Sequence, residues 1–300
     1  MEWIDYRGWR AVRLANREVE LVVTRDVGPR ILRFGFLGGP NVFAEYERQA
    51  GGRGEAEWMI RGGHRLWIAP ESPAWSYEPD NVPYEAAEAV PGGVLTRQSP
   101  GPVTGLVKQM EIRLAEDENR VTVKHSLTNT RDVPVRCSIW AISVMAPGGQ
   151  AIIPLPPRTT PAENLLPTQN WSFWGYTNLG DSRLVFGHNA VLFRQQAGRP
   201  PNKIGLKQRE GWGAYQLGGL LFVKSFDCIA DAVYPDGDVN FECYTNEEML
   251  EVESLGPLVS LPPGETISRT EVWRLHAGVP WCEDDADVAR RVRPLAGGRR

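Results

Sequence analysis

The stretch Trp58-Met-Ile-Arg-Gly-Gly-His-Arg-Leu-Trp-Ile-Ala-Pro-Glu71 is the segment of this chain that says most about its fold and its chemistry. Gly62 and Gly63 permit a sharp turn or a close backbone approach, and His64 and Arg65 follow directly. Tryptophans in and just after the segment, Trp67 and Trp75, offer flat apolar faces with a polar edge. Flat faces beside ionisable donors suit a sugar, although the same pattern also fits a core strand with a tight turn.

Outward from this segment, the chain reads as a succession of strands. The predicted strands cover residues 13–24 (with an internal turn), 30–36, 107–114, 121–127, 133–144, 184–186, 190–193, 214–217, 220–226, 240–244, 249–253 and 266–275. The 31 glycines and 24 prolines separate these runs. Because so many strands need cover on both faces, the sequence predicts a mainly β fold with two large stacked sheets.

The predicted organisation is one β-sandwich domain over residues 1–280, followed by a helical and flexible tail over residues 281–300. The best helix signal lies at residues 283–292, which are acidic at the start and basic at the end, as a helix dipole prefers. Residues 294–300 are rich in Gly and Arg, and we expect them to fray.

Composition excludes several classes of protein. The formal net charge is -4, with 33 basic and 37 acidic residues interspersed, so no nucleic-acid partner is expected. No apolar run is long enough to span a membrane, and the N-terminus lacks the apolar core of a signal peptide. Four scattered cysteines form no C-x-x-C pair, which favours a reduced, cytoplasmic protein without a zinc ribbon. No nucleotide-binding or metalloprotease motif occurs, so we expect no cofactor and no metal. The sequence does not indicate the oligomeric state.

Two segments carry a resemblance to a known family. Residues 61–71, and residues 234–246 continuing through 250–257 to the strand that ends at Trp273, resemble the galactose mutarotase-like (aldose 1-epimerase-like) superfamily. Within it they resemble a bacterial branch termed domain of unknown function 4380. Residues 28–31 and 140–149 match more weakly. The resemblance implies a β-supersandwich that binds a small-molecule carbohydrate in a cleft on one sheet.

The resemblance also implies a catalytic base. Mutarotases open and close a sugar hemiacetal, which needs a general base and a general acid within hydrogen-bond reach of the substrate. The family base, a glutamate on a late strand, aligns with Glu251, and Glu253 is the alternative. Strand alternation places both on one face and Val252 on the other. Two such carboxylates raise one another's pKa, which suits a base near neutral pH. The alternative is that these glutamates are solvated on an outer sheet face.

The acid is where this chain departs from the family. Trp140 stands about where the family carries its acid histidine, and an indole N–H can only donate. His64 remains as the candidate acid, with Arg65 or Arg30 as an electrostatic partner. Equally, His64 could donate to a sugar hydroxyl without moving a proton. We interpret His125 as structural or exposed.

Ten further residues are candidates for binding the substrate. They are Arg30, Arg65, Trp67, Glu71, Trp75, Lys108, Trp140, Lys203, Lys224 and Glu253. The three lysines and two arginines would suit an anionic sugar, whereas isolated lysines in apolar strands usually reach solvent. Residues 171–176 (Trp-Ser-Phe-Trp-Gly-Tyr) either lie over the cleft and supply stacking faces or pack on the sandwich through their own aromatic rings.

Three functions therefore remain open. The first is an aldose-epimerase-like isomerase that uses Glu251 and His64. The second is a carbohydrate-binding protein without catalysis, which Trp140 at the place of the acid favours. The third is a glycoside hydrolase or lyase in which Glu71 or Asp80 lies across the scissile bond from Glu251. A shared fold cannot decide between them.

Overall fold

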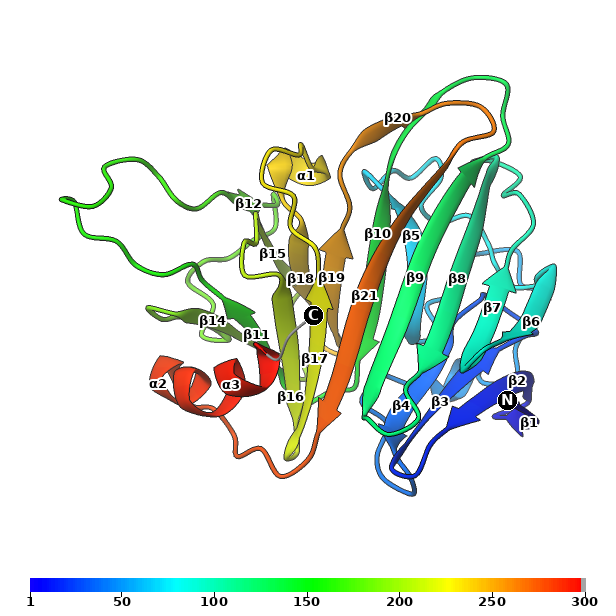
Figure 1. Ribbon diagram of the computed structural model, residues 1–300, viewed down its shortest axis with the longest axis horizontal. Coiled ribbons are helices and arrows are strands. Elements are labelled where there is room, and N and C mark those ends of the chain that lie inside the picture. Colours follow the sequence, from blue (N-terminus) through cyan, green and yellow to red (C-terminus); the bar gives the residue numbers. More distant parts are fainter. Residues whose placement is uncertain (298–300) are drawn as a thin grey trace.

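Two antiparallel sheets packed face to face form the molecule, and the computed structural model describes residues 1–297 (Figure 1). The first sheet has the order β1 (Glu2–Tyr6), β2 (Trp9–Ala15), β3 (Val19–Thr24), β4 (Ile31–Phe36), β5 (Gly63–Ala69), β10 (Val135–Met145), β19 (Leu250–Leu255), β18 (Phe241–Thr245), β15 (Asn202–Leu206) and β12 (Trp171–Phe173). A short strand, β20 (Val259–Leu261), also pairs with β10. The predicted mainly β supersandwich is confirmed.

The second sheet lies over the first, and its two edge strands, β13 and β6, are short. Its order is β13 (Leu184–Phe186), β14 (Ala190–Arg194), β11 (Gln150–Pro154), β16 (Trp212–Leu217), β17 (Leu220–Phe226), β21 (Thr266–His276), β9 (Arg120–Asn129), β8 (Leu106–Leu114), β7 (Gly93–Arg97) and β6 (Ala86–Val90). The predicted hairpin around residues 115–119 joins β8 and β9. Residues 13–24 are divided between β2 and β3, because the Asn16 side chain accepts from the backbone of Glu18 and Val19 and turns the chain.

The core lies between the sheets and is built from the apolar residues that alternate along each strand. At its centre, Phe43 and Phe222 pack edge-to-face with Trp273, while Phe34 meets Phe222 the same way. Burial of such large rings is the main contribution to the stability of a sandwich.

Helices are few and peripheral. η1 (Glu47–Gln49) and α1 (Pro235–Asp238) lie in loops. The C-terminal segment forms α2 (Asp285–Asp287), a π-helical turn (Val288–Val292) and α3 (Arg293–Ala296), and it buries Val288 and Val292 against the outer face of the second sheet. Residues 298–300 of the tail that we expect to fray lie outside the described residues. Within residues 1–297, no helix has the length and apolarity that crossing a membrane requires.

Close backbone contacts explain the Gly-Gly pair before β5. Gly62 and Gly63 have φ values of 80° and 69°, a region that favours glycine. A Cβ at Gly62 would lie 2.0 Å from the carbonyl oxygen of Ala44, and one at Gly63 would lie 2.4 Å from that of Ile31. The expected close approach is confirmed, and it fixes where the side chains of β5 begin to alternate between the core and the outer face.

Candidate functional site

A cleft of about 770 Å³ lies on the outer face of the first sheet, away from the second sheet. It is lined by aromatic, charged and small polar side chains from β5, β10, β15, β18 and β19 and from the loops beside them. The lining residues are Trp58, Ile60, Arg65, Trp67, Glu71, Tyr77, Trp140, Ile142, Trp174, Tyr176, Asn178, Asp181, Pro200, Pro201, Lys203, Tyr244, Asn246, Met249 and Glu251. Seven of these are aromatic, and a mostly apolar cleft with a few placed polar groups is the usual form of a small-molecule site.

Trp67 is the centre of the aromatic floor. Its ring packs edge-to-face with Trp58, Tyr77 and Trp140, at centroid separations of 5.0, 5.3 and 5.5 Å. Trp67 and Trp140 face each other because they are register partners on β5 and β10. Trp67 and Trp140 are buried, whereas Tyr77 stays 46% exposed at the rim. The floor is therefore rigid, while its edge remains open to a ligand.

Arg65 and Glu251 form an ion pair on one side of the cleft. The guanidinium donates from Nη2 to Glu251 Oε1 at 2.9 Å, and it also lies 4.5 Å from the centroid of the Trp67 ring. Burial raises the pKa of Glu251, the positive charge of Arg65 opposes that rise, and the neighbouring Glu253 adds to it. As predicted, Glu251 and Glu253 share one face of β19 and Val252 lies in the core.

A second charged group, made of Lys203, Glu242 and Glu253, lies on the neighbouring strands β15, β18 and β19. Lys203 Nζ lies 2.6 Å from Glu242 Oε2 and 3.2 Å from Glu253 Oε2, and the Trp140 indole donates to the same Glu253 oxygen at 2.8 Å. The ammonium also lies between the rings of Trp140 and Trp174, at 4.9 and 4.7 Å. Burial would lower the pKa of Lys203, but its two carboxylate neighbours outweigh burial and hold this pKa well above the usual value. Burial also raises the pKa of Glu242.

Both cations of the cleft are thus already paired with carboxylates. Arg65 contacts one glutamate and Lys203 contacts two. A ligand anion would have to compete with these buried glutamates, so the cleft does not have the excess positive charge that an anionic sugar would need.

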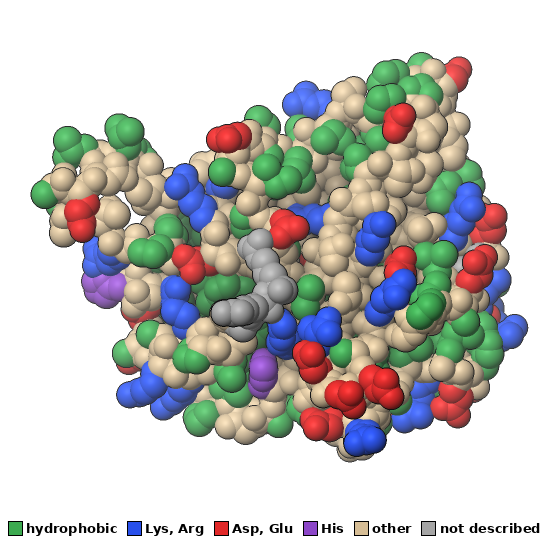
Figure 2. All heavy atoms as spheres, in the orientation of Figure 1, with side chains coloured by type: hydrophobic (Ala, Val, Ile, Leu, Met, Phe, Trp, Pro, Cys, Tyr) green, Lys and Arg blue, Asp and Glu red, His purple; other side chains and the backbone are tan. Residues whose placement is uncertain are grey.

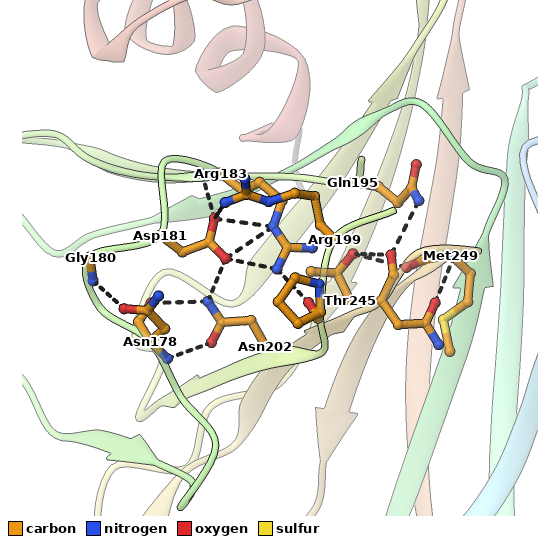
Figure 3. Close-up of polar contacts among 11 residues, drawn as sticks. Asn178, Gly180, Asp181, Arg183, Gln195, Arg199, Asn202, Thr245 and Met249 are labelled. Carbon is orange, nitrogen blue, oxygen red and sulfur yellow. Dashed lines mark hydrogen bonds and ion pairs between the residues drawn. The ribbon is translucent and has the colours of Figure 1, made fainter. Parts of the chain in front are cut away.

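One wall of the cleft is held by a polar cluster around Asp181 (Figure 3). The Asp181 carboxylate accepts from Arg183 Nη2 at 2.8 Å and forms an ion pair with Arg199 at 3.3 Å. Asn202 donates to the carbonyl of Asn178 and accepts from its backbone N–H. Hydrogen bonds from Arg183, the largest cause, lower the pKa of Asp181 to about 2. The cluster ties the loop after β12 to the start of β15, which carries Lys203.

His64 does not face this cleft, so the expectation that it acts there with Glu251 is wrong about its placement. Gly63, Arg65 and Trp67 alternate to the outer face of β5, which sends His64 into the space between the sheets, where it is fully buried. Its Nδ1 lies 2.9 Å from Ser143 Oγ and its Nε2 lies 2.8 Å from His125 Nε2. Burial lowers the pKa of both histidines, that of His125 to about 4, so one neutral ring donates to the other.

Lys224 and Glu271 complete this buried group. Lys224 Nζ donates to the carbonyls of Ala141 and Val252 and lies 3.2 Å from Glu271 Oε1. Potential metal-ligand atoms of His64, His125 and Glu271 lie within 4.8 Å of one another. The ammonium of Lys224 already balances the Glu271 carboxylate, and the histidines hydrogen-bond each other. We therefore interpret the group as a buried hydrogen-bond network below the cleft.

Besides His64, Lys224 and the buried Glu253, three further predicted residues lie away from the cleft lining. Arg30 is fully buried and donates to the carbonyls of Met59 and Ile60 and to Asp80, so it supports the loop that carries Trp58. Lys108 is buried on the inner face of β8, and burial lowers its pKa. Trp75 is half-buried and donates to the carbonyl of Pro70 within its own loop.

Other residues that line or support the cleft were only partly predicted from the sequence. Of the two alternatives for residues 171–176, each describes one part: Trp174 and Tyr176 line the cleft, whereas Trp171 and Phe173 line a different groove and pack against each other. Sequence analysis missed Glu242 and Tyr244, although both alternate on the strand predicted over residues 240–244. It also missed Asp181, which lies in a loop where no periodicity points to a face.

Comparison with known proteins supports the fold. The chain resembles the Slr1438 protein from Synechocystis (TM-score 0.62, 11% identity, 92% of this chain and 100% of that one). It resembles a galactose mutarotase-like protein from Lactobacillus casei (TM-score 0.61, 10% identity, 89% and 100%). It also resembles a galactose mutarotase related enzyme from Lactobacillus acidophilus (TM-score 0.57, 8% identity, 89% and 98%).

The chain therefore has the galactose mutarotase-like fold. At these identities the likeness extends to the fold alone. No family model and no curated protein matches the sequence, and the narrower resemblance to domain of unknown function 4380 stays a prediction.

Proposed function

We propose that the cleft binds a carbohydrate with an uncharged ring. The observation that carries this proposal is the set of seven aromatic side chains around a cleft of about 770 Å³, with paired charges at its base. Aromatic faces suit the apolar C–H faces of a sugar, and the polar side chains of Glu71, Asn178 and Asn246, which line the cleft, can bond its hydroxyls. The fold neighbours include proteins described as galactose mutarotase-like, which is consistent with this class of ligand.

Pairing of Arg65 and Lys203 with carboxylates favours a neutral ring over a sugar acid or sugar phosphate. An anionic ligand would gain little from cations that glutamates already neutralise, and it would approach Glu71 and Glu251 directly. The five cations considered from the sequence thus do not act together on one ligand.

A titration of the isotope-labelled protein with a panel of sugars, followed by NMR, tests the proposal. We expect saturable shifts of cleft residues with at least one neutral aldose and weaker shifts with the matching uronic acid and sugar phosphate. Tyr176→Ala removes a ring that is 49% exposed and should weaken binding by a few-fold to about tenfold. Trp3→Ala, at an aromatic residue outside the cleft, is the control. Absence of shifts across the panel would contradict the proposal.

Proton transfer at the anomeric carbon is a second candidate function, and Glu251 favours it. Its carboxylate faces the cleft, burial raises its pKa, and Arg65 holds it in place. No histidine is among the residues that line the described cleft. The acid would therefore come from another donor or from water. Exchange between the α and β anomers of a bound sugar, measured by NMR, tests this function separately from binding.

Hydrolysis by paired carboxylates is a third candidate function. Of the two carboxylates considered as partners of Glu251, only Glu71 lines the described cleft, and Asp80 does not. Glu71 lines the same cleft as Glu251, and its Oε1 accepts from Tyr77 at 2.6 Å. Asp80 is held by Arg30 behind the loop that carries Trp58. A panel of aryl glycosides would detect the activity, and Glu71→Gln should abolish it.

A further inference from the structure

A second concave surface lies at the open side of the sandwich, apart from the carbohydrate cleft. β12 is the last strand of the first sheet and β13 is the last strand of the second, so both present an unpaired edge there. Between them lies a groove of about 600 Å³. It is lined by Leu155, Arg158, Gln169, Trp171, Phe173, Leu179, Phe186, Gly187 and His188.

The groove combines apolar side chains with the polar Arg158, Gln169 and His188, and its aromatic side chains are poorly covered. Phe173 and Phe186 are 48% and 49% exposed, and Leu179 is 52% exposed. Trp171 packs against both phenylalanines, with centroid separations of 6.3 Å to Phe173 and 5.7 Å to Phe186. Exposed sheet edges beside contiguous apolar side chains are features that proteins usually cover with a partner.

An arm of the same chain leaves from this groove. Residues 155–170 connect β11 to β12 and project from the body of the molecule (Figure 1). Hydrophobic side chains lie at the outer end of the projection (Figure 2). Leu165 and Leu166 on the arm are 86% and 75% exposed, the highest values among the exposed large hydrophobic side chains described.

Local contacts hold the arm in its projecting form. Glu163 accepts at one carboxylate oxygen from the backbone N–H of Thr160 at 2.7 Å and from its hydroxyl at 2.9 Å. Asn164 donates its backbone N–H to the carbonyl of Thr160, which closes a turn just before the two leucines. At the base, Arg158 hydrogen-bonds His188 on the groove. Prolines at 156, 157, 161 and 167 further restrict the backbone. Leu165 and Leu166 are not among the residues that line the chain's own groove.

We propose that two copies of this chain form a dimer by exchanging arms, with Leu165 and Leu166 of each copy seated in the groove of the other. The occupant matches the apolar part of the groove in chemistry, since two branched apolar side chains meet three aromatic rings and two leucines. A two-fold axis makes the contact twice, once for each arm, and closes the assembly. The proposal is independent of what the carbohydrate cleft binds.

Sedimentation velocity across protein concentrations tests the dimer. We expect the wild-type chain to change from monomer to dimer as concentration rises to about 100 μM, a range that detects weak association. The double variant L165D/L166D and the groove variant F173D should each raise the dimer dissociation constant at least about 100-fold, because each places a charge in the apolar contact. V133D, at a side chain that is 45% exposed and lies outside both arm and groove, should leave the constant unchanged.

Mixing the two defective variants is the sharpest test. L165D/L166D keeps an intact groove and F173D keeps an intact arm, so a mixture can form one of the two contacts. We expect a heterodimer that is weaker than the wild-type dimer and stronger than either variant alone.

A wild-type chain that stays monomeric over this range overturns the proposal. So does a dimer that survives both substitutions, or one that F173D abolishes and L165D/L166D does not. Circular dichroism of each variant checks that loss of the dimer is not loss of the fold.

Discussion

Arg65 Nη2 donates to Glu251 Oε1 at 2.9 Å across β10, although the two residues are 186 positions apart in the chain. β5 and β19 each pair with β10, so their outward side chains meet above it. The pair gives the cleft a fixed carboxylate with a charge-assisted hydrogen bond on one oxygen.

If the protein exchanges anomers, Glu251→Gln should lower the rate by on the order of 10²–10⁴ while sugar affinity changes little, because the amide keeps the shape and loses the basicity. Wild-type activity should rise with pH through the pKa of Glu251, which lies above the usual glutamate value. The matched control is Glu248→Gln, at an exposed glutamate of the turn before the same strand. Full activity in Glu251→Gln would remove this residue from the mechanism. Loss of activity in Glu253→Gln alone would assign the base to the other glutamate.

Lys203 is predicted to be needed because it compensates two buried carboxylates. Lys203→Met would leave Glu242 and Glu253 uncompensated at full burial, a change that typically costs about 3–5 kcal/mol of unfolding free energy. The loss should shrink as the pH falls from about 7 to about 5, since burial raises the pKa of Glu242 and this glutamate then binds a proton more readily in the folded state than in the unfolded chain.

Urea unfolding at several pH values measures this change. The triple variant Lys203→Met, Glu242→Gln, Glu253→Gln should recover part of the lost stability, because no buried charge then lacks a partner. Equal losses at pH 7 and pH 5 would contradict the electrostatic explanation.

Asp181 is predicted to hold the wall of the cleft. Asp181→Asn would keep the size of the side chain but weaken its bonds to Arg183, which is 1% exposed, and to Arg199. We expect sugar affinity to fall and the unfolding free energy to drop at neutral pH. Asp181→Asn should also remove a wild-type contribution that is present above about pH 4 and is lost as the pH falls towards 2, because the folded pKa of Asp181 is about 2. Asp231→Asn, at an exposed aspartate, is the control; an equal effect there would refute the assignment.

Alternation allowed much of the sheet and part of the cleft to be predicted from sequence. Glu251, Glu253 and Val252 divided between two faces as a strand requires, and Trp67 faced outward with Arg65. The same alternation could have placed His64 on the inner face, since it lies between Gly63 and Arg65. The Gly62-Gly63 pair indicated a sharp turn with His64 directly after it, whereas the strand already begins at Gly63.

The order in which distant strands pair could not be predicted from any local pattern in the sequence. Which carboxylates meet Lys203 depends on the order β15, β18, β19, and nothing near Lys203 in the sequence indicates that order. For the same reason the sequence could not decide whether the lysines act together, whereas in the structure Lys224 projects from the other sheet into the core and Lys108 is buried on β8.

The buried histidine pair predicts how stability depends on pH. His125 has a folded pKa of about 4 because burial disfavours its charged form, whereas a histidine in the unfolded chain titrates near 6.5. Between these values the unfolded chain binds the extra proton, so the stability contributed by neutral His125 is complete above about pH 6.5 and is lost as the pH falls towards 4. The loss from His125 alone is on the order of 3 kcal/mol, and His64, which Lys224 and Arg65 also disfavour in its charged form, adds to it.

His125→Gln can still hydrogen-bond His64 but does not titrate, so its unfolding free energy should fall less steeply between pH 7 and pH 4 than that of the wild type. His188→Gln, at an exposed histidine, tests whether loss of any histidine flattens the slope. Identical slopes for wild type and His125→Gln in urea unfolding would mean that the buried pair does not set the acid sensitivity of the fold.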